Sequence, residues 1–209
     1  RLLEDYFDRD MVRLPADSFS PAMVSPEILR NIGEWAKAPP PSLIWLDGEP
    51  MQCGDFDNPM TTVAAKVISL AEQSRTPVVS HFCELRRGQK PRPGNDSKEE
   101  QSLAGLVCSL NRQLVELLPP VFEASSDFSA ERFGSLDGTI RCWHTALSVL
   151  ASLAGSMPGP VFCIIDGLHW LNDKSTDNCL PEFIRFLRGG GLKVLLSTTG
   201  RSVVLRNEV

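Results

Sequence analysis

Four short apolar runs punctuate the chain, at residues 42–46, 77–83, 161–165 and 192–196. None of them alternates apolar with polar residues, as a strand with one face in water would. Runs of this kind are buried on both faces, which is typical of a parallel sheet between two layers of helices. The pattern therefore predicts an α/β fold, a three-layer α/β/α sandwich with a mainly parallel sheet and right-handed crossovers.

The segments between these runs carry apolar residues at helical spacing. The starts of two helices also have a clear local signal, either a polar cap before a proline or a capping box. One helix starts at Asp57 or Asn58, which is followed by Pro59, and the other starts at Ser97 with Glu100. Two more helices are predicted near 136–154 and 179–188.

Residues 1–41 are predicted to form a helical extension in front of a domain at 42–209. The first 14 residues are expected to be an amphipathic helix, because apolar side chains recur at helical spacing: Leu3, Phe7, Met11 and Leu14. A second helix is predicted from Pro26 to the prolines at 39–41. We expect the first helix to pack on the domain, since an exposed apolar stripe favours aggregation, although it could dock into a partner's groove.

A polar stretch at 86–98 is predicted to be a mobile surface loop, because it has no apolar residue from Arg86 to Ser97. It contains four basic residues, namely Arg86, Arg87, Lys90 and Arg92. Acidic residues follow at once and no aromatic side chain lies between the basic ones for base stacking. With a net charge of −5, a nucleic-acid partner is not expected.

Composition places the chain among ordinary globular proteins, with 209 residues, 42% hydrophobic and 22% charged. It has no apolar run long enough to span a membrane and no visible signal peptide. The six cysteines form no CxxC pair, and four lie in apolar segments, as buried thiols in a reducing compartment do. We therefore expect an intracellular protein, cytoplasmic or nuclear. Because the chain starts at Arg1, we expect it to be a fragment.

In parallel sheets ligands bind at the carboxyl ends of the strands, so the turn after the first strand is a candidate phosphate loop. When Gly48 is taken as the first glycine of the template GxxxxGK[ST], Cys53 falls at the second glycine, Gly54 at the lysine and Asp55 at the Ser/Thr position. One inserted residue restores Gly54 but puts Asp55 in place of the lysine and Phe56 in place of Ser/Thr. Neither alignment supplies a lysine, and the acidic loop should repel phosphate.

Two further strand ends carry candidate nucleotide contacts. Asp166 ends the third strand, where it could hold Mg²⁺ if a nucleotide binds, or simply cap a turn. The next residue is Gly167 rather than an acid that could position water. Thr198 and Arg201 follow the fourth strand as candidate sensors of a phosphate, although a polar exit from a strand is common.

The order of these elements resembles the P-loop NTPase core of the signal-transduction (STAND) class, including NACHT-type domains. Large fungal proteins that carry such domains have segments similar in character to four in this chain: SLIWLDG, PVVSHFCEL, VFCIIDGLHWL and LKVLLSTTGR. The resemblance covers about residues 42–206. It implies the strand order 2-3-4-1 and a fifth strand, before which this chain is expected to be truncated.

Because the lysine and other catalytic parts are missing, we expect a pseudo-ATPase, without cofactor or turnover, that acts as a protein-interaction or scaffold module in a larger intracellular protein. Its degenerate site would comprise the residues introduced above: Gly48, Gly54, Asp55, Asp166, Thr198 and Arg201. The alternative is an ATP- or GTP-binding switch with Mg²⁺, whose lysine or arginine comes from elsewhere. A cysteine, serine or metal-dependent enzyme is not expected, because the spacing of the nucleophiles and of the three histidines fits no such site.

Overall fold

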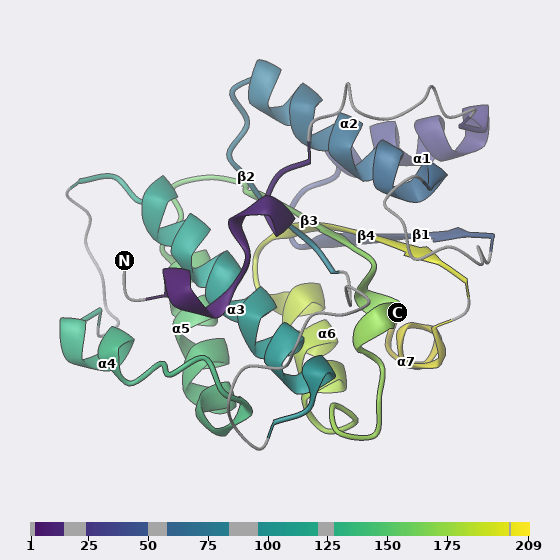
Figure 1. Ribbon diagram of the computed structural model, residues 1–209. Coiled ribbons are helices and arrows are strands. Elements are labelled where there is room, and N and C mark those ends of the chain that lie inside the picture. Colours follow the sequence, from purple (N-terminus) through teal and green to yellow (C-terminus); the bar gives the residue numbers. More distant parts are fainter. Residues whose placement is uncertain (1–2, 15–23, 50–57, 84–95, 121–127, 201) are drawn as a thin grey trace.

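A four-stranded parallel sheet forms the centre of the protein, in a computed structural model that describes residues 3–14, 24–49, 58–83, 96–120, 128–200 and 202–209 (Figure 1). The strands are β1 (Ser42–Gly48), β2 (Val78–Phe82), β3 (Phe162–Asp166) and β4 (Lys193–Thr199). They lie in the order β1-β4-β3-β2, and every neighbouring pair is parallel. Read from the other edge this is 2-3-4-1, so the α/β prediction and the implied strand order are confirmed.

Helices cover both faces of the sheet (Figure 1). The α-helices are α1 (Pro26–Lys37), α2 (Pro59–Gln73), α3 (Lys98–Leu117), α4 (Ala130–Gly134), α5 (Trp143–Gly155), α6 (Cys179–Gly189) and α7 (Val203–Glu208). Short 3₁₀ helices are η1 (Glu4–Tyr6), η2 (Arg9–Met11), η4 (Ile140–Cys142) and η5 (Leu168–Leu171). The predicted start signals are confirmed: Asn58 caps α2 with Pro59 in its first turn, and Ser97 with Glu100 forms a capping box on α3.

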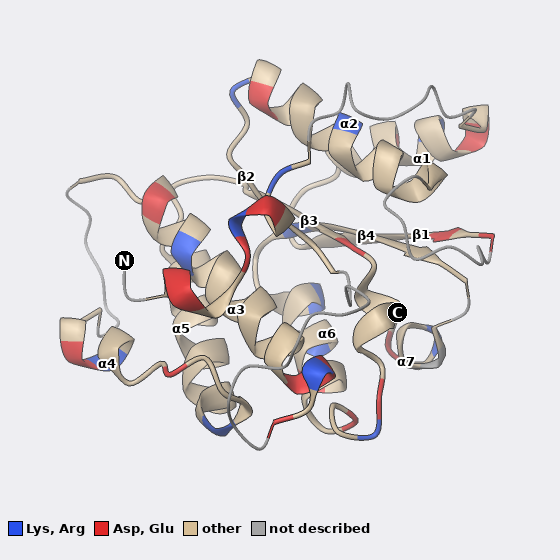
Figure 2. Ribbon diagram, viewed as in Figure 1, with Lys and Arg blue, Asp and Glu red and all other residues tan. Residues whose placement is uncertain are grey.

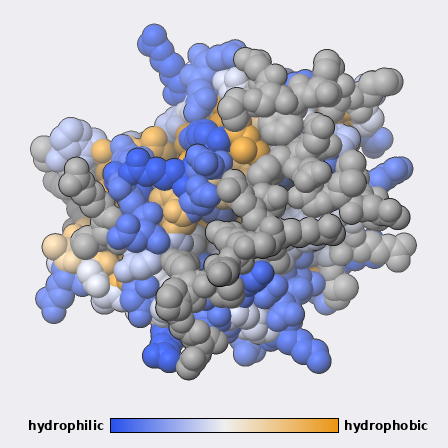
Figure 3. All heavy atoms as spheres, viewed as in Figure 1, coloured by the Kyte–Doolittle hydropathy of each residue, from blue (hydrophilic) through white to orange (hydrophobic). Residues whose placement is uncertain are grey.

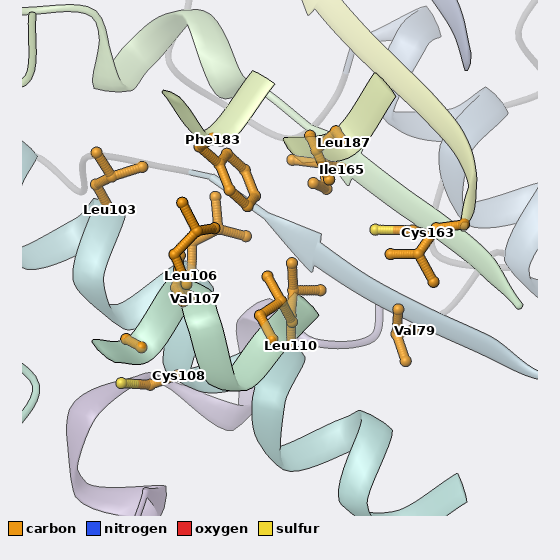
Figure 4. Close-up of a cluster of buried hydrophobic side chains, with 14 of the residues drawn as sticks. Val79, Leu103, Leu106, Val107, Cys108, Leu110, Cys163, Ile165, Phe183 and Leu187 are labelled. Carbon is orange, nitrogen blue, oxygen red and sulfur yellow. The ribbon is translucent and has the colours of Figure 1, made fainter. Parts of the chain in front are cut away.

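Each face of the sheet has its own hydrophobic core. The first lies under α3, α5 and α6, where Leu106, Leu110 and Phe183 pack against Ile165 (Figure 4). The second lies under α1 and α2 and includes Ile164, the next residue along β3. Successive residues of a strand point to opposite faces, so burial of both explains why the strands are apolar without alternation.

Residues 3–14 do not form the predicted amphipathic helix. They form η1 and η2, with Phe7 extended between them at φ −143° and ψ 157°. The side chain of Asp8 accepts the backbone N–H of Asp10, and such local bonds compete with helix formation. The expected packing on the domain is nevertheless found, because Leu3 and Met11 are 3% and 6% exposed.

The outer edge of β2 is closed by side chains. Gln113, on α3, accepts the backbone N–H of Ser80 at 2.9 Å and donates its own amide to the Ser80 carbonyl at 2.8 Å. These are the two bonds that a neighbouring strand would make. Arg13 donates to the carbonyl of Val78 at 3.0 Å. An open edge invites pairing with another chain, and here that edge is capped from within.

Lys193, the first residue of β4, ties α1 to the sheet. Its ammonium donates to the carbonyls of Ala36 and Ala38 at 2.6 and 2.5 Å, at the C-terminal end of α1. The same nitrogen lies 5.7 Å from the ring centre of Trp35 and 5.4 Å from that of Phe162. A cation is favourable at the negative end of a helix dipole and over aromatic faces, so this buried lysine holds the layer in place.

Acidic and basic residues are interspersed over the helices in the view of Figure 2. On the same face, hydrophilic atoms cover most of the described surface, with small hydrophobic areas between them (Figure 3). Among the described helices, none is both long and apolar enough to cross a bilayer.

The predicted mobile loop at 86–98 is only partly described, since residues 84–95 lie outside the described ranges. Its last residues lead into α3. Asp96 accepts the backbone N–H of Ile140 at 3.2 Å, Ser97 caps α3, and Lys98 begins that helix. Capping bonds to a neighbouring element therefore hold the end of this polar stretch.

The described cysteines are free thiols, as expected, although Cys142 is only partly buried. Cys83, Cys108 and Cys163 are buried, while Cys142 and Cys179 are partly exposed. Burial raises the pKa of the Cys163 thiol to about 12, so this group is an inert part of the core.

Candidate functional site

A buried carboxylate marks the carboxyl edge of the sheet. Asp166, the last residue of β3, is 5% exposed. One of its oxygens accepts the hydroxyl of Thr61 at 2.5 Å, and the other accepts the hydroxyl of Ser197 at 2.7 Å. Thr61 lies in the first turn of α2, and Ser197 is the register partner of Asp166 on β4. Three elements therefore meet at this one side chain.

Asn58 extends this cluster at the start of α2. Its side-chain oxygen accepts the backbone N–H of Thr61 at 2.8 Å, and its amide nitrogen donates to the Thr61 hydroxyl at 2.7 Å. The Thr61 hydroxyl thus accepts from Asn58 while it donates to Asp166. This chain of bonds fixes the N-terminus of α2 against the end of β3.

Gly167 is required by the turn that follows Asp166. Its φ is +76°, which a residue with a side chain rarely adopts. A Cβ at this position would also lie well inside 3.0 Å of the backbone oxygen of Cys83. At the position directly after Asp166 the backbone therefore leaves no room for a side chain.

The structure places three of the predicted site residues at this edge, Gly48, Asp166 and Thr198. A Cβ on Gly48 would lie 2.5 Å from Cγ of Met60, so the end of β1 approaches the first turn of α2 closely. Thr198 follows Ser197 and points to the other face of the sheet. Its hydroxyl accepts the indole N–H of Trp45 at 3.0 Å. The remaining predicted residues, Gly54, Asp55 and Arg201, lie outside the described residues.

Sequence reasoning from Gly48 missed Thr61, Asn58 and Ser197. The signal for Thr61 was present, because counting GxxxxGK[ST] from Gly54 puts Pro59 at the second Gly, Met60 at the Lys and Thr61 at the Ser/Thr. This third alignment has a hydroxyl at its Ser/Thr position, which neither alignment on Gly48 has. The lysine position holds Met60, which is 6% exposed and packs in the second core.

His169 lies on η5 near the ends of β1 and β4. Its Nε2 is 3.4 Å from the hydroxyl of Thr199, and its ring lies 4.9 Å from that of Trp170, which is 39% exposed. Burial lowers the pKa of His169 to about 4, with Asp47 acting in the opposite direction. The imidazole is therefore neutral at pH 7.

Asp166 is the member of the cluster whose protonation changes near neutral pH. Burial raises its pKa from 3.8 to about 6, although the hydrogen bonds from Ser197, Thr61 and the Gly167 backbone act against this. Between about pH 6 and 4 the folded protein binds this proton more tightly than the unfolded chain does. Asp166 therefore contributes stability as the pH falls through that window.

Two histidines have the opposite effect. Burial lowers the pKa of His81, which is buried, and of His169, which is half-buried, from 6.5 to about 4. Acid removes the stability that these neutral rings contribute, between about pH 6.5 and 4. Protonation of Asp166 over the same pH range opposes that loss of stability.

Asp166→Asn should therefore lose more stability than the wild-type protein when the pH is lowered from 7 to 4. Urea unfolding at pH 7, 5 and 4 measures this difference. Asp173→Asn is the control, because hydrogen bonds from Ser175 lower the pKa of Asp173, so its effect falls below this window. Parallel pH curves for Asp166→Asn and the wild type would show that Asp166 does not titrate as described.

The described residues include no group of three His, Cys, Asp or Glu side chains that could hold a metal ion. The oxygens of Thr61 and Asp166 are the kind of donors that Mg²⁺ prefers. At this edge the chain therefore offers a hydroxyl and a carboxylate, beside the buried thioether of Met60.

Comparison with known proteins places the chain in a family. No curated protein matches it. The family model described as "Nephrocystin 3, N-terminal" matches residues 29–199, from the first turn of α1 to the last residue of β4. The match includes the whole sheet and every residue of the Asp166 cluster. The chain therefore belongs to the nephrocystin 3 N-terminal family.

Proposed function

We propose that this domain is a degenerate NTPase of the STAND type, kept as an intracellular protein-interaction or scaffold module. The observation that carries the proposal is the buried thioether of Met60 at the lysine position of the phosphate-loop template. The Asp166 cluster supports the ancestry, and Met60 supports the loss of nucleotide binding.

Met60 cannot do what a lysine does at this position. Its side chain is apolar and packs against Gly48 at the end of β1. The lysine of a working loop makes charge-assisted hydrogen bonds to the terminal phosphates, and a bond of this type contributes about 1.5–3 kcal/mol. Lys66 comes almost two turns later on α2 and is exposed. The first turn of α2 therefore has no cation for the triphosphate.

Turnover would also need a group that positions the attacking water. Gly167 occupies the place after Asp166, and the close approach of the Cys83 carbonyl leaves no room there for an acid. Asp173, the next acidic residue along the chain, accepts the backbone N–H of Ser175 at 2.9 Å and so caps its own turn. Both observations support the loss of hydrolysis.

The interaction role draws support from the layer of α1 and α2. Leu29 on α1 is 57% exposed and Leu70 on α2 is 60% exposed. A partner protein that covered these two leucines would remove apolar surface from water.

The retained contact between Thr61 and Asp166 favours a second candidate, a weak nucleotide-binding switch. In P-loop proteins the Ser/Thr hydroxyl and the acid at the end of the third strand both face Mg²⁺. Thr61 and Asp166 fit such a cation, whereas Met60 does not fit the phosphates. The alternative therefore needs a cation from another part of the chain.

Calorimetry with ATP or GTP and Mg²⁺ tests the proposal. Wild-type protein should give no binding heat at micromolar nucleotide, and Met60→Lys should bind about ten- to a hundredfold more tightly, the gain expected from one charge-assisted contact. Met60→Leu is the matched control, because it keeps an apolar side chain and should not bind.

Micromolar affinity of the wild-type protein would contradict the proposal and favour the switch. A turnover assay with Asp166→Ala would then show whether the site hydrolyses the nucleotide.

A further inference from the structure

Residues 3–14 form a strap that wraps around the β2 edge of the sheet (Figure 1). Leu3, at one end, is part of the core under α3 and α5, while Leu14, at the other, packs against the core under α2. The strap precedes the family match, which begins at residue 29. It is therefore an addition to the part of the chain that the family model covers.

The strap is seated in a slot made by two glycines. Gly105 lies inside α3, where a Cβ would come within 2.7 Å of the Tyr6 carbonyl oxygen. Gly138 has a φ of +70°, and a Cβ there would overlap the ring of Tyr6. A glycine inside a helix costs about 0.5–1 kcal/mol relative to alanine. Gly105 therefore lowers the stability of α3 but leaves room for Tyr6.

Charged side chains fix both ends of the strap. Glu4 contacts Arg112 of α3 at 3.3 Å. Arg13 donates to Glu72 at 3.0 Å and to the Val78 carbonyl at 3.0 Å, and it also bonds the hydroxyl of Ser80. These contacts join the strap to α2, α3 and β2 at once.

The contacts are those of a peptide lying in a groove rather than those of an added strand. Gln113 already takes the outward backbone groups of Ser80, so the strap meets β2 through side chains. Its own secondary structure is limited to two 3₁₀ turns. Its binding energy therefore comes from a few anchors: Leu3, Tyr6, Met11 and Arg13.

We propose that the slot around Gly105 and Gly138 is a peptide-binding site, which residues 3–14 fill in cis. The partner is a protein segment with the same chemistry: an apolar anchor, an aromatic residue three positions later, an apolar residue five further on, and an arginine two after that. This inference rests on the proposed interaction role and gives it a surface separate from the α1 and α2 layer.

The strap controls access because it belongs to the same chain. A tethered ligand acts at an effective concentration on the order of millimolar, so a partner segment must compete with it. The apparent affinity for a free peptide falls in proportion to the fraction of open slots. Weakening the strap should therefore increase binding of the peptide without changing the slot.

Fluorescence anisotropy with a labelled synthetic peptide of residues 1–14 tests this in the full chain, without nucleotide. Tyr6→Ala combined with Arg13→Ala, which weakens the strap, should bind the peptide about tenfold or more tightly than the wild-type protein does. Adding Gly105→Ala should abolish that binding, because the new Cβ fills the slot. Adding Gly33→Ala, in the interior of α1 where nothing lies within 4 Å, should leave it unchanged.

Equal peptide affinity for the wild-type and weakened-strap chains would overturn the proposal, as would binding that survives Gly105→Ala. Circular dichroism checks that each variant is folded, and Arg13→Ala alone offers a milder change that keeps Tyr6 in place. Because no nucleotide is present, failure here is distinct from failure of the proposed loss of nucleotide binding.

Discussion

Phe183→Ala should lower the free energy of unfolding by about 3–5 kcal/mol, the usual cost of removing a buried aromatic side chain. Phe183, on α6, is 0% exposed. Its ring lies edge-on to that of Trp143 at 6.3 Å and points into the first core (Figure 4). Truncation would leave a cavity where α5 and α6 meet over the sheet. Urea unfolding followed by far-UV circular dichroism measures the loss.

Phe186→Ala is the matched control for this prediction. Phe186 lies on the same helix, stacks on Phe183 at 6.4 Å and is only partly buried. Its removal should cost clearly less, because water can reach part of the space that it leaves. Equal losses for the two variants would mean that the core under α6 is not packed as described.

Gly167→Ala should destabilise the protein by about 3 kcal/mol, because two independent penalties add at one position. A side chain in the left-handed conformation costs about 1–2 kcal/mol, and backbone strain of this kind falls in a range of about 1–3 kcal/mol. The new Cβ would also collide with the carbonyl oxygen of Cys83. That carbonyl belongs to the backbone and cannot rotate away as a side chain could.

Gly33→Ala is the control and should change stability in the other direction. Gly33 lies in α1, and a Cβ there would have nothing within 4 Å. Alanine in a helix interior is favoured over glycine by about 0.5–1 kcal/mol. Thermal and urea unfolding of both variants give the comparison. A loss for Gly167→Ala no larger than 1 kcal/mol would show that the turn after β3 can relax.

Local chemistry was sufficient to predict most of the fold. The apolar runs identified all four strands, because strands buried on both faces must be apolar throughout. Caps identified the starts of α2 and α3, since the signals at Asn58 and Ser97 act on neighbouring backbone groups. The N-terminal strap was not predicted correctly, because its shape depends on the distant residues Gly105 and Gly138.

The candidate site was predicted less completely, for two physical reasons. The spacing template has two possible starting glycines, and the sequence alone does not reveal the hydrogen bond between Thr61 and Asp166. Ser197 depends on the register of β4 against β3, which places it opposite Asp166. A single sequence gives the order of the residues along each strand but not which residues of two strands are neighbours.

The amide of Gln113 also determines at which edge the sheet can accept another strand. It occupies the backbone groups that Ser80 would offer to another strand, so β2 ends the sheet on that side. At the other edge, Leu43, Ile44 and Trp45 of β1 are only partly buried. Any strand that extends this sheet, whether from the same polypeptide or from a neighbouring one, must therefore pair with β1. A single side chain of α3 thus makes the two edges unequal.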